Sequence, residues 1–235
     1  MLLVNSAVLL MLGRGRSSGS RGGVGGSASG RSGSPSAKDI QALGDLFAKY
    51  ASADDDNEIG PEGVESLCGD LGTDPSDVSV LHLAWKMQAA RMGFFTRDEF
   101  IRGCVALGVP SAKAGITAAG IKERLPSAAT EVESKRDALV DFHTYAFKFC
   151  LTEPLQKTLD LDTACAMLQL VLPGAPHTEK FCEFLKEQTE YKRVTLDQWT
   201  SFLRFNEEVA EDCSGYDETQ AWPLLIDLYV EKMTN

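Results

Sequence analysis

Acidic side chains between Ser52 and Gly63 stand at spacings that could ligate calcium. Aligning Ile59 with the hydrophobic eighth position of an EF-hand loop sets the register. Ser52, Asp54 and Asp56 then occupy ligand positions one, three and five. The twelfth position is Gly63, although a calcium loop needs a bidentate glutamate there. We therefore expect a degenerate loop without metal, and no other residues predict a metal site or a cofactor.

Cys213 is the strongest candidate nucleophile, because it lies in the loop-like stretch DCSGYD, where it could be exposed. A reactive thiol needs a nearby cation to lower its pKa, and no Lys, Arg or His stands close to Cys213 in the sequence. We interpret it as a small thiol packed in a loop. Because the chain also lacks a G-x-S-x-G turn, a Ser-His-Asp order and a phosphate-binding loop, no residue is predicted to be catalytic.

The cysteines and histidines indicate neither a zinc site nor a disulfide framework. There are six cysteines and three histidines, and no two cysteines form a C-x-x-C pair. His82 lies among apolar residues and is expected to be a hydrogen-bonded histidine of the core. Reduced, buried thiols are typical of a reducing compartment, so we expect the protein in the nucleus and cytoplasm.

The charge of the chain favours a basic protein as partner. Its composition is that of a globular protein, with 43% hydrophobic and 24% charged residues and a net charge of −11. Nucleic acid needs a basic surface, so no nucleic-acid partner is expected. Between Asn206 and Glu231 there are eight acids and not one Lys or Arg. Such an acidic stretch predicts a contact with basic side chains of another protein.

Residues 1–37 differ from the rest of the chain. An apolar run over residues 2–12 is too short to span a bilayer, so we expect no membrane partner. The residues that follow are rich in Gly, Ser and Arg and contain no acid, which predicts a disordered tail. Such a composition is also seen in organellar transit peptides, which we keep as a minor alternative.

Residues 38–235 are predicted to be helical throughout, which indicates an all-α fold with short connections. Thr96 with Glu99 and Thr195 with Gln198 have the spacing of a capping box at a helix start. Pro61 and Pro75 are each expected to open a helix. The apolar stripes at three- and four-residue steps include Ile40, Leu43, Phe47 and Tyr50; Val64, Leu67, Cys68 and Leu71; Leu139, Phe142, Ala146 and Phe149; and Trp199, Phe202 and Leu203.

The last helix is expected to begin near Trp222, because Pro223 lacks an N–H and fits only the first turn. This register buries Leu224, Leu225 and Leu228 and turns Asp227 outward. No cation stands four residues before or after Asp227, so its compensating charge is expected to come from another molecule.

Four segments of the chain resemble the defective-in-cullin-neddylation family and its potentiating-neddylation (PONY) domain. They are SVLHLAWKM (79–87), FFTRDEF (94–100), VTLDQW (194–199) and YDETQAWPLLID (216–227). The resemblance covers residues 38–235. It implies degenerate EF-hand-like helices, about 38–125, packed on a C-terminal helical subdomain that binds cullins, about 126–235.

The resemblance implies a scaffold-type ligase that forms no covalent intermediate. Such a protein binds a cullin together with the conjugating enzyme that carries a ubiquitin-like modifier, so it contacts the modifier only indirectly. The family motif places the cullin-binding residues at Asp197, Ala221 and Asp227. Their expected partner is the C-terminal winged-helix region of the cullin, through its Lys and Arg side chains.

A second site implied by the resemblance is an apolar pocket for the acetylated N-terminal methionine of the neddylation conjugating enzyme. Met87, Gly93 and Met167 differ from animal members, which have Phe, Cys and Tyr there, so the rim of the pocket is expected to differ. The residues carried over to the pocket by position are Val64, Val80, Leu83, Ala84, Met87, Ala89, Phe95, Phe149 and Leu170.

Two alternatives from other functional classes remain at this point. The first is a degenerate EF-hand module that acts as a calcium sensor, which would change its helicity or melting with calcium. The second is a thiol-relay enzyme, which would trap the modifier on Cys213 as a reducible adduct.

Overall fold

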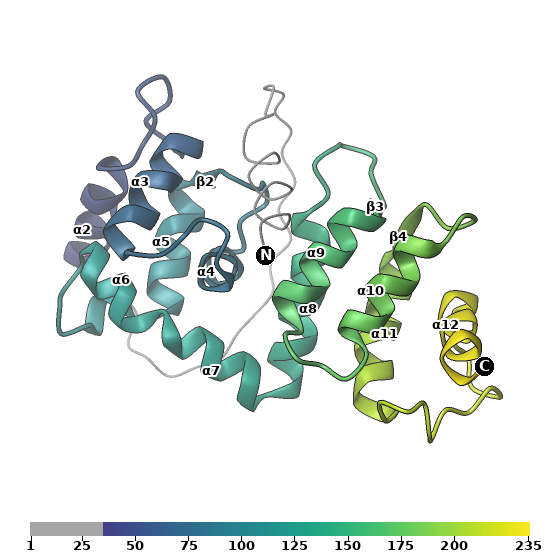
Figure 1. Ribbon diagram of the computed structural model, residues 1–235. Helices are drawn as coiled ribbons and strands as arrows, with labels where there is room; N and C mark the ends of the chain where they lie inside the picture. The colour runs from purple at the N-terminus through teal and green to yellow at the C-terminus, as the bar shows by residue number, and fades with distance from the viewer. Residues whose placement is uncertain (1–34) are drawn as a thin grey trace. The chain divides into compact units, whose positions relative to one another are not determined.

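The computed structural model describes residues 35–235, which fold into helices and four very short strands (Figure 1). The tail predicted for residues 1–37, with its apolar run and its arginines, lies almost entirely outside the described residues. Ser36 accepts a hydrogen bond from the backbone N–H of Asp39 and caps the first described helix, which begins at Ala37. No helix in residues 35–235 has the length and apolarity needed to cross a bilayer.

The chain divides into two compact units at Ala128 and Ala129, within helix α7. Unit 1 contains two successive helix–loop–strand–helix segments, and the strands of the two segments pair antiparallel, with Glu58 opposite Thr96. Its elements are α2 (Ala37–Ala48), β1 (Glu58–Ile59), α3 (Pro61–Leu71), α4 (Val78–Met87), β2 (Phe95–Thr96), α5 (Arg97–Ala106), the 3₁₀ turn η1 (Val109–Ser111), α6 (Ala118–Arg124) and the start of α7 (Pro126–Ser134).

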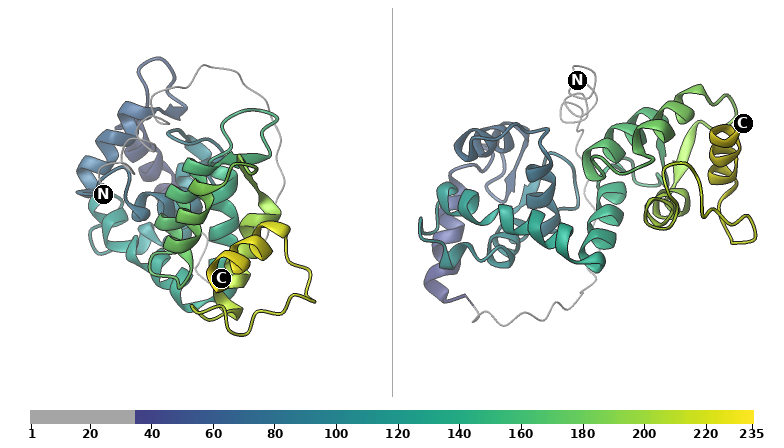
Figure 2. Two further views of the ribbon diagram at one scale, coloured as in Figure 1. Left: turned by 45° about the vertical axis from the view of Figure 1, so that its right-hand side comes forward. Right: turned by 60° about the horizontal axis from the view of Figure 1, so that its bottom comes forward.

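Unit 2 repeats this order of elements. Its strands also pair antiparallel, with Leu159 opposite Val194, and each strand leads directly into a helix. The loop from α11 to α12 is the longest connection of this unit (Figure 2). The elements are the end of α7, α8 (Arg136–Phe149), β3 (Thr158–Asp160), α9 (Leu161–Val171), α10 (Thr178–Glu187), β4 (Arg193–Thr195), α11 (Leu196–Glu208) and α12 (Leu224–Thr234).

The predicted all-α class is confirmed, since no strand in the described part of the chain exceeds three residues. Both predicted capping boxes are present: Thr96 and Glu99 exchange hydrogen bonds at the start of α5, and Thr195 and Gln198 do so at α11. Each cap is the last residue of a strand, so the strand pair fixes where the helix begins. The likeness of unit 1 to an EF-hand pair stays a prediction.

One predicted helix start was wrong, and that of the last helix was close. Pro75 lies in a turn, and α4 begins at Val78 because Asp77 accepts a hydrogen bond from the N–H of Ser79. At the C-terminus, α12 begins at Leu224 after Pro223, so the start lies two residues beyond Trp222. A short polar side chain that binds a free N–H sets the start of α4 more strongly than a proline.

Aromatic side chains from different helices pack against each other in the core of unit 1. The rings of Phe47 in α2 and Phe100 in α5 meet edge to face, with centroids 5.6 Å apart, and both side chains are fully buried. Val64 and Leu67 of α3 are buried as the helical spacing predicted.

Gly63, at the twelfth position of the calcium-like loop, lies where no side chain fits. A Cβ built on it would stand 2.1 Å from the backbone oxygen of Tyr50 and 2.8 Å from Cγ2 of Ile59. The other candidate ligands are partly used inside the loop: Ser52 Oγ accepts from the N–H of Gly60, and Asp56 accepts from the Asn57 amide. Packing therefore excludes the carboxylate ligand that calcium would need at this position.

We predict that Gly63→Ala destabilises unit 1 by about 1–3 kcal/mol, because the new methyl group overlaps backbone that cannot move aside. Gly69→Ala is the matched control, since Gly69 lies in the same helix and a Cβ placed on it would meet no other group within 4 Å. This control should instead stabilise the protein by about 0.5–1 kcal/mol. Urea unfolding of both variants measures the difference, and equal stabilities would contradict the packing described for Gly63.

Unit 2 contains a buried histidine with no hydrogen-bond partner on its ring. His143 is fully buried, and neither ring nitrogen finds a partner among the described residues. The ring stacks on Trp199, with centroids 4.6 Å apart, while Trp199 Nε1 donates to the His143 backbone oxygen at 2.8 Å. Burial lowers the pKa of His143 to about 3.

His143 should therefore make the protein sensitive to acid. In the unfolded chain its pKa is about 6.5, so the stability it contributes is complete above that pH and is lost progressively as the pH falls toward 3. At pH 5 the loss amounts to about 2 kcal/mol, at about 1.4 kcal/mol per pH unit. His143→Leu should reduce the difference in unfolding free energy between pH 7.5 and pH 5 by this amount. An unchanged difference would mean that His143 is not neutral and buried as described.

Candidate functional site

Asp197 is presented by the capped start of α11. Thr195 Oγ1 accepts from the N–H of Gln198 at 3.2 Å, and the Gln198 side chain accepts from the N–H of Thr195 at 2.9 Å. Trp199, two residues after Asp197, is buried, and this anchors the first turn. Asp197 is exposed at the second helical position, where the helix dipole favours a carboxylate.

The loop between α11 and α12 is held against α11 by aromatic rings. Phe205 of α11 meets Tyr216 and Trp222 edge to face, at 6.2 and 5.8 Å between centroids. Tyr216 and Trp222 stack on each other, and the guanidinium of Arg204 lies 4.2 Å from the centroid of the Trp222 ring. These contacts place Ala221, which is exposed, beside the surface of α11.

Helix α12 is positioned by a buried hydrogen-bonded network. His177 Nδ1 lies 3.0 Å from the hydroxyl of Tyr229, and its Nε2 lies 3.2 Å from the backbone oxygen of Val209. A carbonyl oxygen can only accept, so Nε2 carries the proton and Nδ1 accepts from Tyr229. Burial lowers the pKa of His177, which keeps this neutral tautomer.

Asp227 is half-buried in the first turn of α12 and accepts a hydrogen bond from the hydroxyl of Tyr216. Burial, and then this hydrogen bond to a carboxylate, raise the pKa of Tyr216, so the tyrosine remains a neutral donor. No ion pair of Asp227 with a described cation is present. The structure therefore leaves the carboxylate charge of Asp227 uncompensated among residues 35–235.

The positions of the three predicted cullin-binding residues can be described relative to helix α11. Asp197 and Arg204 lie seven residues apart, on one stripe of the helix and about 10 Å along its axis. Arg204 donates to Gln220 and stacks on Trp222, the two neighbours of Ala221. Ala221 therefore lies beside Arg204, about two turns of α11 from Asp197, and Asp227 is linked to the same loop through its bond to Tyr216. We call Asp197, Ala221 and Asp227 the acidic patch.

Arg204 contacts the end of this loop, at Gln220 and Trp222, and its charge is balanced. It makes two bonds to the carboxylate of Glu208, at 2.9 and 3.0 Å. The basic residue thus holds the loop in place without removing the negative charge of Asp197 or Asp227.

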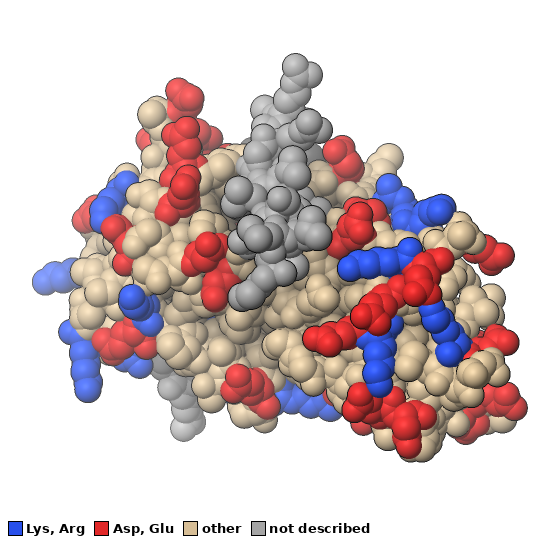
Figure 3. All heavy atoms as spheres, in the orientation of Figure 1, with Lys and Arg blue, Asp and Glu red and all other residues tan. Residues whose placement is uncertain are grey.

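The acidic stretch from Asn206 to Glu231 has fewer unpaired carboxylates than its sequence indicated. Glu207 pairs with Arg136 at 3.0 Å, Glu208 with Arg204, and Glu211 with Lys180 at 2.9 Å. Arg136 and Lys180 come from other helices, which the local sequence could not reveal. Within this stretch of the described chain, the acids without an ion pair are Asp212, Asp217, Glu218, Asp227 and Glu231. Figure 3 shows carboxylates and cations interleaved over α10 and α11, and carboxylates prevailing toward the loop that leads to α12.

The register predicted for α12 was partly wrong. Leu225 is fully buried as expected, but Leu224 is 62% exposed and Leu228 is half-buried. Ile226 and Tyr229 are buried instead, because the face that packs on α11 lies one residue further on than predicted. Asp227 points away from this packed face only in part, since Tyr216 covers one side of it.

The residues predicted for the acetyl-methionine pocket divide between the two units. Those in unit 1 are all buried, with exposures from 0% for Met87 to 9% for Val80. In unit 2, Phe149 is buried and Leu170 is half-buried. Ordinary core residues have the same burial, so the pocket stays a prediction. Gly93 adopts a left-handed backbone with φ of 79°, which explains why glycine suits that position.

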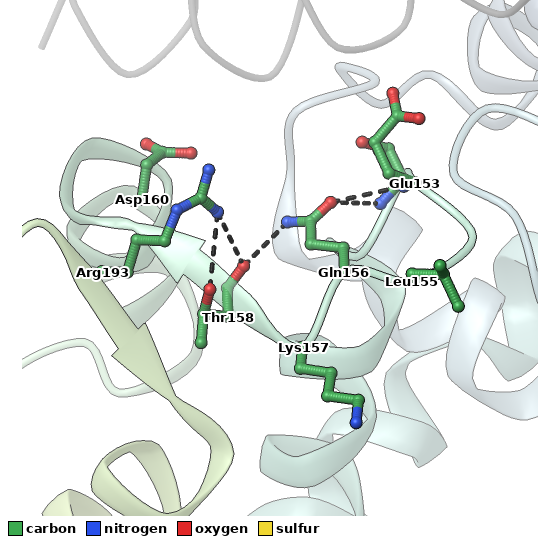
Figure 4. A pocket seen from close by; sticks show the side chains of 8 residues that line it. Glu153, Leu155, Gln156, Lys157, Thr158, Asp160 and Arg193 are labelled. Atoms are coloured by element: carbon green, nitrogen blue, oxygen red, sulfur yellow. Dashed lines mark hydrogen bonds between the residues drawn. The ribbon is translucent and has the colours of Figure 1, made fainter.

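A shallow pocket of about 550 Å³ in unit 2 lies elsewhere, and none of the predicted site residues lines it (Figure 4). Arg193 Nη1 donates to the backbone oxygen of Thr158 at 3.3 Å, and the Gln156 amide donates to the same oxygen at 2.9 Å. The Gln156 side-chain oxygen in turn accepts from the N–H of Thr152. The side chains of Gln156 and Arg193 thus bind backbone groups of this pocket and hold the loop before β3.

Cys213 is poorly suited to act as a nucleophile. It is buried, with 6% exposure, and burial raises the pKa of its thiol. The interpretation of a packed loop thiol is confirmed, and all six cysteines are free and buried. His82 is likewise buried, as expected, and burial lowers its pKa.

Comparison with known proteins places this geometry in a family. The model of a family described as cullin binding matches residues 120–232, which include the whole acidic patch. The chain is 39% identical over 178 residues to DCN1-like protein 2 of Dictyostelium discoideum, covering 76% of this chain and 64% of that protein. It is 37% identical over 189 residues to human DCN1-like protein 5, covering 79% and 74%.

DCN1-like protein 3 of Rattus norvegicus is 38% identical over 196 residues, covering 82% of this chain and 62% of the relative. The chain thus spans somewhat less than two thirds of the length of two of these relatives. Identity at this level over most of the chain establishes the relationship that the four sequence segments indicated. This protein belongs to the DCN1-like family, the defective-in-cullin-neddylation family.

Proposed function

We propose that this protein promotes cullin neddylation as a scaffold that binds a cullin and the N-acetylated conjugating enzyme at the same time. The observation that carries the proposal is the match of the cullin-binding family model to residues 120–232. These residues contain a surface with two carboxylates, Asp197 and Asp227, that have no ion-pair partner within residues 35–235.

The cullin contact follows from the chemistry of the acidic patch. Lys and Arg side chains of the winged-helix region of a cullin would pair with Asp197 and Asp227. The methyl group of Ala221, which is exposed, permits close approach of the two backbones. Asp227 is held by Tyr216 and needs little further ordering when a cation arrives, which limits the entropic cost of binding.

The second contact in this proposal is with the conjugating enzyme. Its N-terminal methionine would enter the predicted apolar pocket, which includes Leu83, Met87 and Phe95 of unit 1. Acetylation removes the charge of the terminal ammonium, and burying that charge without a partner would be costly. The acetylated enzyme should therefore bind more tightly than the free amine.

Such a protein needs no reactive group. Holding the thioester close to the acceptor lysine turns an encounter of separate molecules into a step within one complex, which can be worth several kcal/mol. The buried thiol of Cys213, with its raised pKa, agrees with a role as an interaction module. Nuclear and cytoplasmic residence, where cullins would be met, is part of the same proposal.

Asp197→Arg should weaken binding of the C-terminal region of a cullin at least about tenfold, since it replaces attraction by repulsion. The matched control is Asp162→Arg, because Asp162 occupies the same second helical position in α9 and is also exposed. Titration calorimetry on both variants, with far-UV circular dichroism for the fold, measures the effect. Equal losses in the two variants would indicate a general effect of charge.

Asp227→Arg should abolish capture of the cullin in a pull-down without changing the far-UV circular dichroism. The new guanidinium would meet the basic side chains of the partner at the centre of the contact. Glu218→Arg changes the net charge equally at an exposed position of the preceding loop. Intact binding by Asp227→Arg would remove this residue from the site.

Reconstituted cullin modification tests the scaffold itself. With partners below saturation, the protein should accelerate transfer strongly when the conjugating enzyme is acetylated and only weakly when its amine is free. Cys213→Ser should retain this acceleration. A reducible adduct of the modifier with the wild-type protein that Cys213→Ser cannot form would instead establish the thiol-relay alternative. No acceleration in either form would reject the proposed function.

A further inference from the structure

Leu224 is a large apolar side chain that unit 2 leaves in solvent. It is 62% exposed, although it lies in a helix whose other face is fully buried. Within the described residues, the only other large apolar side chains that are exposed are Ile40 and Leu155. A single exposed leucine is common on protein surfaces. Leu224 differs from such isolated leucines because it lies among the residues of the acidic patch.

Leu224 lies between two residues of the acidic patch. Ala221, three residues earlier, is exposed, and Asp227, three residues later, lies on the same face of α12. Leu228 and Glu231 continue this face, the first half-buried and the second exposed. The face therefore alternates between apolar and acidic groups along the helix.

The helix holds this face rigidly. Leu225, Ile226 and Tyr229 are fully buried, and Tyr229 is bound to His177. Leu224 therefore cannot turn inward without dismantling the packing of α12 on α11. A side chain fixed in this way loses little conformational freedom when a partner covers it.

The charges around Leu224 specify what kind of surface can cover it. Asp227 and Glu231 have no ion pair within residues 35–235. A purely apolar partner would bury these carboxylates without compensation, which is costly. A partner with an apolar side chain flanked by Lys or Arg satisfies both kinds of group.

We propose that Leu224 is an apolar anchor of the cullin contact. It receives an apolar side chain of the docked cullin, while basic side chains one and two helical turns away pair with Asp227 and Glu231. This inference rests on the proposed function and adds a residue that decides affinity. Central apolar anchors within a polar rim commonly carry a large share of binding energy.

Leu224→Ala should weaken binding of the purified C-terminal region of a cullin about tenfold, measured by titration calorimetry on the full chain. Leu155→Ala is the matched control, because Leu155 lies in the same unit, is 90% exposed and is remote in sequence from the acidic patch. The control should bind like the wild type. Both side chains are exposed, so thermal melts of both variants should stay close to that of the wild type.

The salt dependence separates the apolar contribution from the ionic one. Leu224→Ala should lower the affinity equally at low and high salt, whereas Asp227→Asn should lower it mainly at low salt, where charges are screened least. Wild-type affinity in Leu224→Ala, together with lost binding in Asp227→Arg, would overturn the anchor and leave the proposed function standing. Failure of the wild-type protein to bind the cullin would overturn both.

Discussion

The buried hydrogen bond between Tyr229 and His177 is the constraint on which the candidate surface depends. His177 precedes α10, Val209 follows α11, and Tyr229 lies in α12, so one imidazole ring joins three segments far apart in the sequence. Its two nitrogens are both satisfied, so the polar group is buried without loss. The position of α12, and with it Asp227 and Leu224, follows from this network.

A series of aromatic contacts connects this buried hydrogen bond to the surface at Asp227. The ring of Tyr229 lies edge to face against Phe181 and Phe205, and Phe205 in turn contacts Tyr216 and Trp222. Tyr216 donates to Asp227 at the end of this chain of contacts. A rigid core thus sets the place of a carboxylate at the surface. Such rigidity suits a protein whose proposed contribution to a reaction is geometry.

The distribution of ion pairs limits which part of this acidic chain can attract a basic partner. A net charge of −11 spread over the protein would attract basic partners with little selectivity. Pairing of Glu207, Glu208 and Glu211 with cations removes much of the charge along α11 and the start of the loop. The carboxylates of this region that stay unpaired among the described residues lie in the loop before α12 and on α12 itself. Selectivity for a basic partner then comes from the positions at which a carboxylate has no ion-pair partner.

Local sequence was sufficient for most of the helical elements, although not for the start of α4 or the register of α12. The capping boxes at Thr96 and Thr195 formed as predicted, because a hydroxyl and a carboxylate or amide three residues on satisfy each other's backbone N–H groups locally. The buried stripes of α3 and α11 also followed from helical spacing. Family motifs likewise located Asp197, Ala221 and Asp227 in the chain, and Asp197 stands in the capped first turn that spacing alone predicted.

The tertiary structure decided which side chains are buried, paired or sterically excluded, and the local sequence pattern does not contain this information. Leu224 was predicted to be buried and is exposed, since the register of α12 depends on Tyr229 and His177, whose positions differ by 52 residues. Glu207 appeared unpaired until α8 brought Arg136 to it, and the backbone of Tyr50 leaves no room for a side chain at Gly63. Helix propensity and capping act over a few residues, so the sequence determined them by itself. Burial, ion pairing and steric exclusion depend on which distant residues meet, and only the folded chain sets that.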